Sequence, residues 1–399
     1  MRTSRSNVVV SFINVGHFID HYFLLIFPTA VLGMGVTFDL SFGELLALAT
    51  GSFVAFGAGS LPAGWLGDRW SRRNMMVVYL VGIGAAGVLT GLTSTPVMLA
   101  VCLTTLGLFS SIYHPIGTAM LAADAGDRLG RRMGLNGVFG NLGVAGAALV
   151  TGALTQWLGW RYAFIVPGCL AIAVGLAFWA VVPDGVGMAK AGARRRLDVP
   201  RAVVLRVFLV LALVVLAGSV VFQSATVSLP KLFQERLTGL AVSTFAVGLL
   251  AAAIYTVGAV TQLVVGRMVD RFGLRGAFLG VSALAAPCLL AASVATDWLM
   301  LPAAGGIMAA IFGQVTINDT MLGRYSTDEW RSRIFAVRYF LGFVTAGAAV
   351  PLVSIMHDRT GGFGVLFASL SVLGALVFVG ALLFPRAASR PAPSLAAAQ

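Results

Sequence analysis

Residues 64–73 read Gly-Trp-Leu-Gly-Asp-Arg-Trp-Ser-Arg-Arg, and residues 266–275 read Gly-Arg-Met-Val-Asp-Arg-Phe-Gly-Leu-Arg. Both stretches fit the pattern G-x-x-x-D-R-x-x-x-R, and the second follows the first after 202 residues. A second echo links 132–148 with 333–349, which share an arginine, a phenylalanine and an Ala-Gly-Ala-Ala run at matching positions. Repetition at one long period indicates a duplicated unit. The sequence therefore predicts two homologous halves.

The composition predicts that the chain lies in a lipid bilayer. Of the 399 residues, 58% are hydrophobic and only 11% are charged, whereas a soluble domain carries about 25% charged residues. A net charge of +12 would suggest nucleic acid as the partner of a soluble protein. Here the basic residues lie between apolar runs instead, so we expect lipid and no nucleic acid as the surroundings.

Twelve apolar runs are long enough to cross a bilayer as helices. The first begins after Arg2 and Arg5 and is longer than a signal-peptide core, so we interpret it as a retained span. The runs are 8–33, 43–66, 74–94, 97–121, 133–156, 161–182, 204–229, 243–266, 276–295, 298–322, 334–355 and 361–384. They predict an all-α membrane protein with a six-helix bundle over 1–182, a basic linker over 183–203, a second six-helix bundle over 204–385 and a tail over 386–399.

The distribution of lysine and arginine predicts the orientation of these spans. With twelve spans, successive loops alternate between the two sides of the membrane. One side, which includes both termini, holds 22 of the 27 basic residues and the other holds four, while Arg338 falls inside a span. Because short cytoplasmic loops are enriched in Lys and Arg, we expect both termini and the linker to be cytoplasmic.

The two loop motifs resemble the signature loop of the major facilitator superfamily, G-x-L-a-D-R-x-G-R-[KR], with Ser71 in place of the second glycine of the first copy. The resemblance covers the whole chain, with six plus six spans and a basic central loop. It implies the major facilitator fold, a monomer, and loops that latch the halves together on the cytoplasmic side. The residues to which this latching role would transfer are Gly64, Asp68, Arg69, Arg72, Arg73, Gly266, Asp270, Arg271 and Arg275. The alternative for the arginines is plain positive-inside charge.

A narrower resemblance concerns three of the spans. Residues 16–20 (Gly-His-Phe-Ile-Asp), 110–115 (Ser-Ser-Ile-Tyr-His-Pro) and 136–143 (Asn-Gly-Val-Phe-Gly-Asn-Leu-Gly) are similar to segments of the fosmidomycin-resistance group of bacterial efflux transporters. This resemblance implies a place in the bacterial inner membrane and an export function.

The first span carries polar side chains on one helical face. His17 follows Asn14 by three residues, and Asp20 and His21 follow His17 by three and four. Counted from the span's start, His17 to His21 lie roughly 15–20 Å deep, near the bilayer midplane. Ionisable groups there are costly and by default mark a pathway or a ligand site, and histidine titrates near neutral pH. We therefore expect these residues to couple proton movement to substrate movement.

Two other readings of this face stay open. The histidines could serve only as hydrogen-bonding partners between packed helices. The same spacing would also supply three metal ligands. Because no second group of ligands accompanies them in the sequence, we predict no metal site.

Further polar residues fall inside predicted spans of both halves. Arg338 is either an arginine that reaches to the interface or an anchor for an anionic substrate, and Asp319 could simply pair with it. The candidates for substrate binding or proton coupling beyond the first span are His114, Asn141, Gln314, Asn318, Asp319 and Arg338.

These features predict a secondary transporter that moves a small organic solute by alternating access, most directly as proton-coupled efflux. Organic-anion uptake by symport or exchange is the alternative, and a non-transporting receptor or scaffold is a distant one. We expect no enzyme, because the sequence contains no GxSxG, HExxH or P-loop motif. We also expect no cofactor.

Overall fold

The computed structural model describes residues 2–123, 129–184, 200–240, 242–325 and 328–386. All regular secondary structure in these ranges is helical. The helices are α1 (Arg2–Ala30), η1 (Val31–Gly33), α2 (Gly35–Phe38), α3 (Phe42–Ala47), α4 (Thr50–Arg69), α5 (Arg72–Gly91), α6 (Pro96–Ser110), α7 (Tyr113–Ala123), α8 (Leu129–Trp157), α9 (Trp160–Val181), α10 (Arg201–Arg236), α11 (Thr244–Val294), α12 (Asp297–Tyr325), α13 (Asp328–Thr360) and α14 (Gly364–Leu383).

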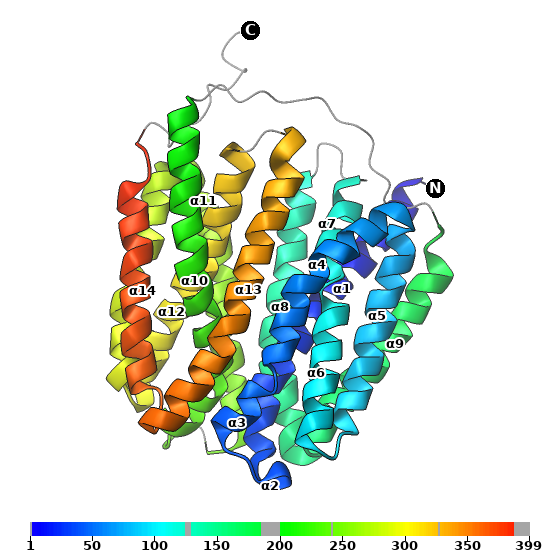
Figure 1. The fold of residues 1–399 in the computed structure, drawn as a ribbon, viewed down its shortest axis with the longest axis vertical. Coiled ribbons are helices and arrows are strands. Elements are labelled where there is room, and N and C mark those ends of the chain that lie inside the picture. The colour runs from blue at the N-terminus through cyan, green and yellow to red at the C-terminus, as the bar shows by residue number, and fades with distance from the viewer. Residues whose placement is uncertain (1, 124–128, 185–199, 241, 326–327, 387–399) are drawn as a thin grey trace.

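Eleven helical segments of the described chain are long and apolar enough to cross a membrane. One of them, α11, has 51 residues and is broken at Gly273, where φ is 74° and ψ is 163°. The break divides α11 into two crossings, so the chain crosses twelve times, and the predicted all-α fold is confirmed. An even number brings the start of α1 and the end of α14 to the same end of the bundle (Figure 1). We call this end the terminal face and the other end the opposite face.

Several spans differ from their predicted form. The second, predicted as one helix over 43–66, is divided into α3 and α4 at residues 48–49. The fourth, predicted as one helix over 97–121, is divided into α6 and α7 at residues 111–112. The cause is Pro115, which has no N–H to donate to the carbonyl of Ser111. The seventh, α10, runs on through Pro230 to Arg236, beyond the predicted end at 229, because Leu232 and Phe233 are fully buried.

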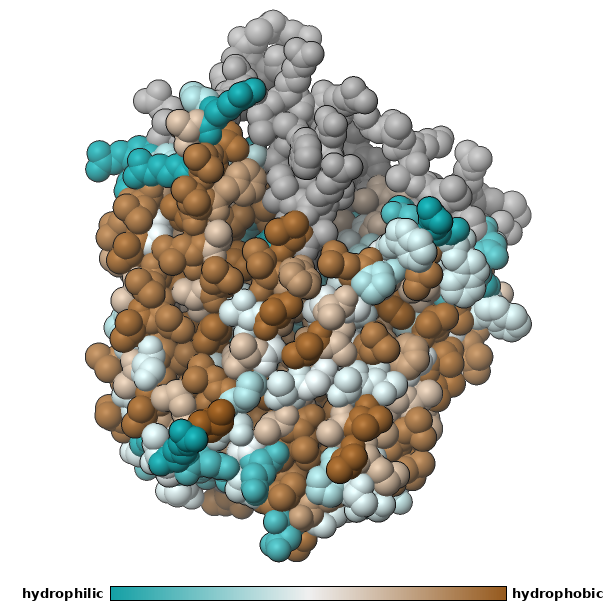
Figure 2. All heavy atoms as spheres, viewed as in Figure 1, coloured by the Kyte–Doolittle hydropathy of each residue, from teal (hydrophilic) through white to brown (hydrophobic). Residues whose placement is uncertain are grey.

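The outer surface of the bundle matches a bilayer environment. Figure 2 shows apolar side chains over the flanks and hydrophilic ones gathered toward the two ends. Leucine, valine and tryptophan side chains account for many of the exposed large residues, among them Leu209, Leu263 and Trp179. Lipid favours such a surface, and water meets the protein only at its ends.

Pairs of helices join the first six spans to the last six. α8 packs against α11, and α4 packs against α13. A Cβ added at Gly152 of α8 would lie 2.8 Å from the carbonyl oxygen of Thr244 and 3.1 Å from Cα of Gly248, both at the start of α11. Near the opposite face these backbones are therefore in direct contact, an approach that only glycine permits.

Toward the terminal face the glycines of these two helices have open space beside them. A Cβ added at Gly134 or Gly137 of α8, or at Gly266 of α11, would have nothing within 4 Å. The close backbone contact at Gly152 is therefore not repeated at these three glycines. The predicted linker, 183–203, and tail, 386–399, lie mostly outside the described residues, so the domain boundaries stay predictions.

Candidate functional site

Polar side chains of α1 face the interior of the first six spans. Asn14, His17 and Asp20 are buried, and Asp20 has no exposed surface. The predicted polar face of this span is therefore turned away from lipid. Bundle-facing ionisable groups of this kind are typical of pathways and ligand sites.

Asn136 of α8 fixes the position of His17. The Nδ1–H of His17 donates to the main-chain oxygen of Asn136 at 2.7 Å. The side-chain amide of Asn136 donates to Asn14 Oδ1 at 3.0 Å and to the Tyr113 hydroxyl at 2.8 Å. That hydroxyl in turn donates to the carbonyl of Ile13 at 3.0 Å. Because a carbonyl only accepts, the proton of neutral His17 lies on Nδ1 and leaves Nε2 as an acceptor.

Asp20 is held by the broken fourth span. The hydroxyl of Ser110, the last residue of α6, donates to Asp20 Oδ1 at 2.8 Å. His114, in the first turn of α7, places its Nε2 3.4 Å from Asp20 Oδ2. The break between α6 and α7 thus sets a hydroxyl and an imidazole on the two oxygens of one buried carboxylate.

Three imidazole rings meet beside Asp20. The ring centroid of His17 lies 4.7 Å from that of His21 and 5.4 Å from that of His114, and His21 and His114 are 5.6 Å apart. One ring nitrogen from each lies within 4.8 Å of the others. Within the described structure, Nε2 of His17 and of His21 are buried without a hydrogen-bond partner. Such a group can pass or store protons, and its spacing is also one that could hold a metal ion.

The predicted candidates of the other half form separate pairs. Arg338 Nη1 lies 2.7 Å from Asp319 Oδ1, and Gln314 Nε2 donates to Asn318 Oδ1 at 2.9 Å. Arg338 therefore has Asp319 as a carboxylate partner, the pairing that the sequence allowed, and its role at the interface or as a substrate anchor stays a prediction.

Side chains of the second half contact His114 and the neighbouring helices α4 and α8. Phe343 of α13 packs its ring 5.9 Å from that of His114 and 4.2 Å from that of Phe56 on α4. Asn141 of α8 donates to Gln262 Oε1 of α11 at 2.7 Å. Gln262 was not predicted as a site residue, although a glutamine inside the eighth predicted span was a signal that could have identified it.

The first loop motif is an ordered connection between α4 and α5. Asp68 binds Arg72 at 2.7 Å, and its side chain is 65% exposed. Ser71 caps the start of α5 by accepting from the N–H of Asn74 and donates to Asp184 at 3.0 Å. Arg69 lies over the ring of Trp65.

The second loop motif has a different turn. Gly273 has positive φ, whereas the equivalent Ser71 has φ −168°. Leu274 takes the place of Arg72, so Asp270 lacks the arginine four residues on. Arg271 lies over Phe272, and Gly266 has open space beside it.

A further polar group at the opposite face was not identified from the sequence. Asp358, near the end of α13, accepts from the Ser41 hydroxyl at 2.6 Å and from the N–H of Gly43 at 3.1 Å. Ser354 donates to the carbonyl of Gly43 at 2.7 Å. His357 lies 2.8 Å from Glu235. The bonds of Asp358 and Ser354 join the start of the second span to the end of the eleventh, and the His357–Glu235 contact joins the eleventh to α10. Of these, only the Ser-x-x-Glu capping pattern at residue 41 was visible in the sequence.

Comparison with known proteins places this arrangement in a family. The model of the Major Facilitator Superfamily matches residues 10–245. A puromycin resistance protein from Streptomyces alboniger is 29% identical over 150 residues, which are 37% of this chain and 29% of that protein. A probable 4-methylmuconolactone transporter from Cupriavidus pinatubonensis is 27% identical over 165 residues, 39% of each chain. The match therefore spans well under half of the length of these two relatives.

A solved structure extends the likeness to the whole fold. It is that of a bacterial homologue of the human lysosomal transporter Spinster, in an inward-facing, unoccupied conformation, with a TM-score of 0.76. The alignment covers 98% of this chain and 99% of that one at 15% identity, so the likeness concerns the fold alone. From its family model, its twelve crossings and its paired signature loops, this chain belongs to the Major Facilitator Superfamily of membrane transporters, which are not enzymes.

Proposed function

We propose that this chain is a proton-coupled transporter that exports a small organic solute across the bacterial inner membrane by alternating access, with Asp20 and the three histidines as the proton-coupling site. The observation that carries the proposal is the position of Asp20, a fully buried carboxylate whose neighbour His114 touches Phe343 of the other half. A titratable group at such a junction can link its own protonation to movement of the two halves.

The conformation gives this site access to one side. At the opposite face, Asp358 and the contact between Gly152 and Gly248 hold the halves together. At the terminal face Gly134 and Gly137 of α8 and Gly266 of α11 have open space beside them, and we infer that the halves are open at this end. If the terminal face is cytoplasmic, as the excess of basic residues there favours, the conformation is inward-facing.

In the proposed cycle, the charge of Asp20 controls the position of His114. Ionised Asp20 attracts the His114 ring, which lies 3.4 Å away at Nε2. When Asp20 takes up a proton, that attraction is lost and the ring can shift against Phe343 on α13. The vacant acceptors on His17 and His21 offer the proton a next position. Alternating access follows from this movement of one half against the other.

We propose export as the direction of transport. We also propose that the signature loop acts as a latch at the terminal face. The relative named for puromycin resistance and the resemblance of 16–20, 110–115 and 136–143 to the fosmidomycin-resistance group both favour efflux. Asp68 binds Arg72 in this conformation and is 65% exposed, and we propose that it exchanges this partner for one across the terminal face when the halves close there. We expect the transporter to act as a monomer.

Uptake of an organic anion is the second candidate, and Arg338 is the residue that favours it. A guanidinium in the interior can bind a carboxylate substrate. Here Asp319 already occupies that guanidinium at 2.7 Å, so an anion would have to compete with an internal partner. The relative named as a probable 4-methylmuconolactone transporter supports this second candidate.

The test is a flux measurement in liposomes containing the purified full chain and an internal pH dye. A panel of organic acids, phosphonates and hydrophobic cations is offered to wild type, Asp20→Asn and His17→Ala. The matched control is Asp39→Asn, which makes the same chemical change at an exposed residue whose φ of 53° suits asparagine. Substrate-dependent proton flux in wild type and the control, lost in the other two, supports the proposal. Substrate movement without any proton signal would contradict coupling, and no movement of any compound would favour a receptor.

A further inference from the structure

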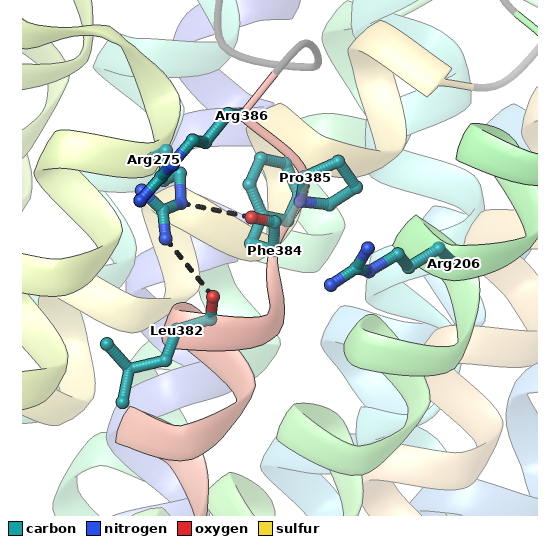
Figure 3. Close-up of a pocket in the computed structure, with 6 residues that line it drawn as sticks. All are labelled: Arg206, Arg275, Leu382, Phe384, Pro385 and Arg386. Atoms are coloured by element: carbon teal, nitrogen blue, oxygen red, sulfur yellow. Dashed lines mark hydrogen bonds between the residues drawn. The ribbon is translucent and has the colours of Figure 1, made fainter.

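A pocket lined by three arginines lies at the terminal face of the second half. Its volume is about 360 Å³, and its lining residues are Arg206, Arg275, Leu382, Phe384, Pro385 and Arg386. Figure 3 shows the three guanidinium groups arranged around the end of α14. The described residues that line the pocket include no aspartate or glutamate.

Two of these arginines are held in place by the protein itself. Arg275 donates to the carbonyls of Phe384 and Leu382 at 3.0 and 3.1 Å. Arg206 donates through Nε to the carbonyl of Leu383 at 2.9 Å. Each guanidinium has five N–H donors, so donors are left over on both, and their orientation is already fixed. Preorganised guanidinium groups of this kind suit phosphate oxygens.

The equivalent place in the first half contains a carboxylate instead. Arg73, which is equivalent to Arg275, donates to the carbonyl of Val182 at 2.9 Å. Two residues after Val182 comes Asp184, which accepts from Ser71. The same offset from Phe384 leads to Arg386. One copy of the repeat therefore supplies its own anion, and the other replaces it with a third cation.

The pocket also lies where lipid headgroups would be. It surrounds the end of the last membrane span, and Leu382 and Leu383 beside it are about half exposed. We propose that Arg206, Arg275 and Arg386 bind the phosphate of an anionic phospholipid from the adjoining leaflet. The exposed leucines lie along the acyl chains while the phosphate enters the pocket. This site is separate from the proton-coupling site and does not depend on it.

Lipid binding to the purified full chain tests the proposal. Wild type, Arg206→Gln, Arg386→Gln and the double variant are titrated with phosphatidylglycerol in detergent, and bound lipid is counted by native mass spectrometry. We expect each single variant to bind about fivefold more weakly, because one basic residue near the surface contributes about that much, and the double variant more weakly still. Glutamine at 206 keeps a donor for the carbonyl of Leu383, so loss of folding does not explain the result.

Three comparisons make the result decisive. Arg201→Gln removes an exposed arginine that lies in α10, like Arg206, but outside the pocket. It should leave the affinity for phosphatidylglycerol unchanged. A loss of affinity equal to that of Arg206→Gln would show general charge attraction and overturn the site. Phosphatidylcholine, which has a phosphate but no net charge, should bind at least fivefold more weakly than phosphatidylglycerol. Inorganic phosphate is added as a competitor in the same titration. If it displaces phosphatidylglycerol with an affinity equal to that of the lipid, the pocket is a site for a free anion and the assignment to lipid is overturned.

Discussion

Arg73 and Arg275 make the same contact in the two halves of the protein. Each ends its copy of the signature loop, and each donates through Nε to the carbonyl that follows the last span of its own half, that of Val182 or Phe384. A second donor of each arginine reaches another carbonyl at the same helix end. The last arginine of the motif therefore joins the loop to the sixth span of its half.

Replacement of either arginine should destabilise the protein by a similar amount. Arg73→Ala and Arg275→Ala each leave two helix-end carbonyls without a charged donor, and we expect a loss of about 1–3 kcal/mol in the free energy of unfolding. Arg69→Ala, in the same loop but over the Trp65 ring, should cost less than about 1 kcal/mol. Reversible unfolding in detergent measures all three. Equal losses for Arg69 and Arg73 would show that the carbonyl contacts contribute nothing.

The two loop copies should respond unequally to exchange of their turn residues. Gly273→Ser places a side chain at φ 74°, which we expect to cost about 1–2 kcal/mol. Ser71→Gly leaves an extended backbone that glycine accepts. It loses a helix cap, for which glycine substitution costs a few tenths of a kcal/mol, and an exposed hydrogen bond to Asp184, so we expect a total cost below about 1 kcal/mol. The same unfolding measurement checks the pair. A larger loss for Ser71→Gly would contradict the conformations of these turns.

Closure at the opposite face should depend on Gly152. In Gly152→Val the side chain meets the start of α11, so the closed opposite face is disfavoured and the population shifts toward the state that is open at that face. Gly137→Val, in the same helix but with open space beside it, is the matched control. Electron–electron distance measurements between spin labels on the opposite-face ends of α6 and α14 report the shift. Longer distances in both variants, or in neither, would contradict the account of closure.

Asp358 should stabilise the same closed face. Asp358→Ala removes the acceptor of the Ser41 hydroxyl and of the Gly43 N–H. Hydrogen bonds to a charged group contribute about 1.5–3 kcal/mol, so a roughly tenfold or larger gain in the population that is open at the opposite face is expected. Transport should slow because return to the state that is closed at this face is impeded. An unchanged distance distribution would exclude this role.

Transport should not require a metal ion. The three histidines have a spacing that could hold one, yet the proton-coupling account needs only their protonation. Dialysis against a chelator should leave substrate-dependent flux unchanged, and added Zn²⁺ should inhibit wild type more than His21→Ala. Loss of flux on chelation, with recovery on adding back the metal, would show that the histidines act as a metal site instead.

Much of the fold was predictable from the sequence because lipid imposes simple requirements. Twelve apolar runs and the alternation of basic loops were enough for the number of crossings. The division of the fourth span was not predicted, although Pro115 was its visible cause. The length of α10 was missed because burial of Leu232 and Phe233 depends on neighbouring helices rather than on local hydropathy.

The candidate site was predictable only within single helices. Helical periodicity placed Asn14, His17 and Asp20 on one face, and all three are buried. Periodicity could not show that His114 would join them, because the bend between α6 and α7 sets that ring beside Asp20. Asn141 and Gln262, which share a hydrogen bond, are 121 residues apart in the chain, so no local sequence pattern predicts that bond.

The most direct test of the central claim separates proton coupling from substrate movement in Asp20→Asn. In liposomes, wild type should drive uphill substrate movement with an imposed pH gradient and should also exchange labelled for unlabelled substrate without one. If Asp20 carries the coupling proton, Asp20→Asn should keep the exchange and lose the gradient-driven movement, while Asp39→Asn keeps both. Undiminished gradient-driven movement in Asp20→Asn would contradict the claim that this buried carboxylate couples protons to transport.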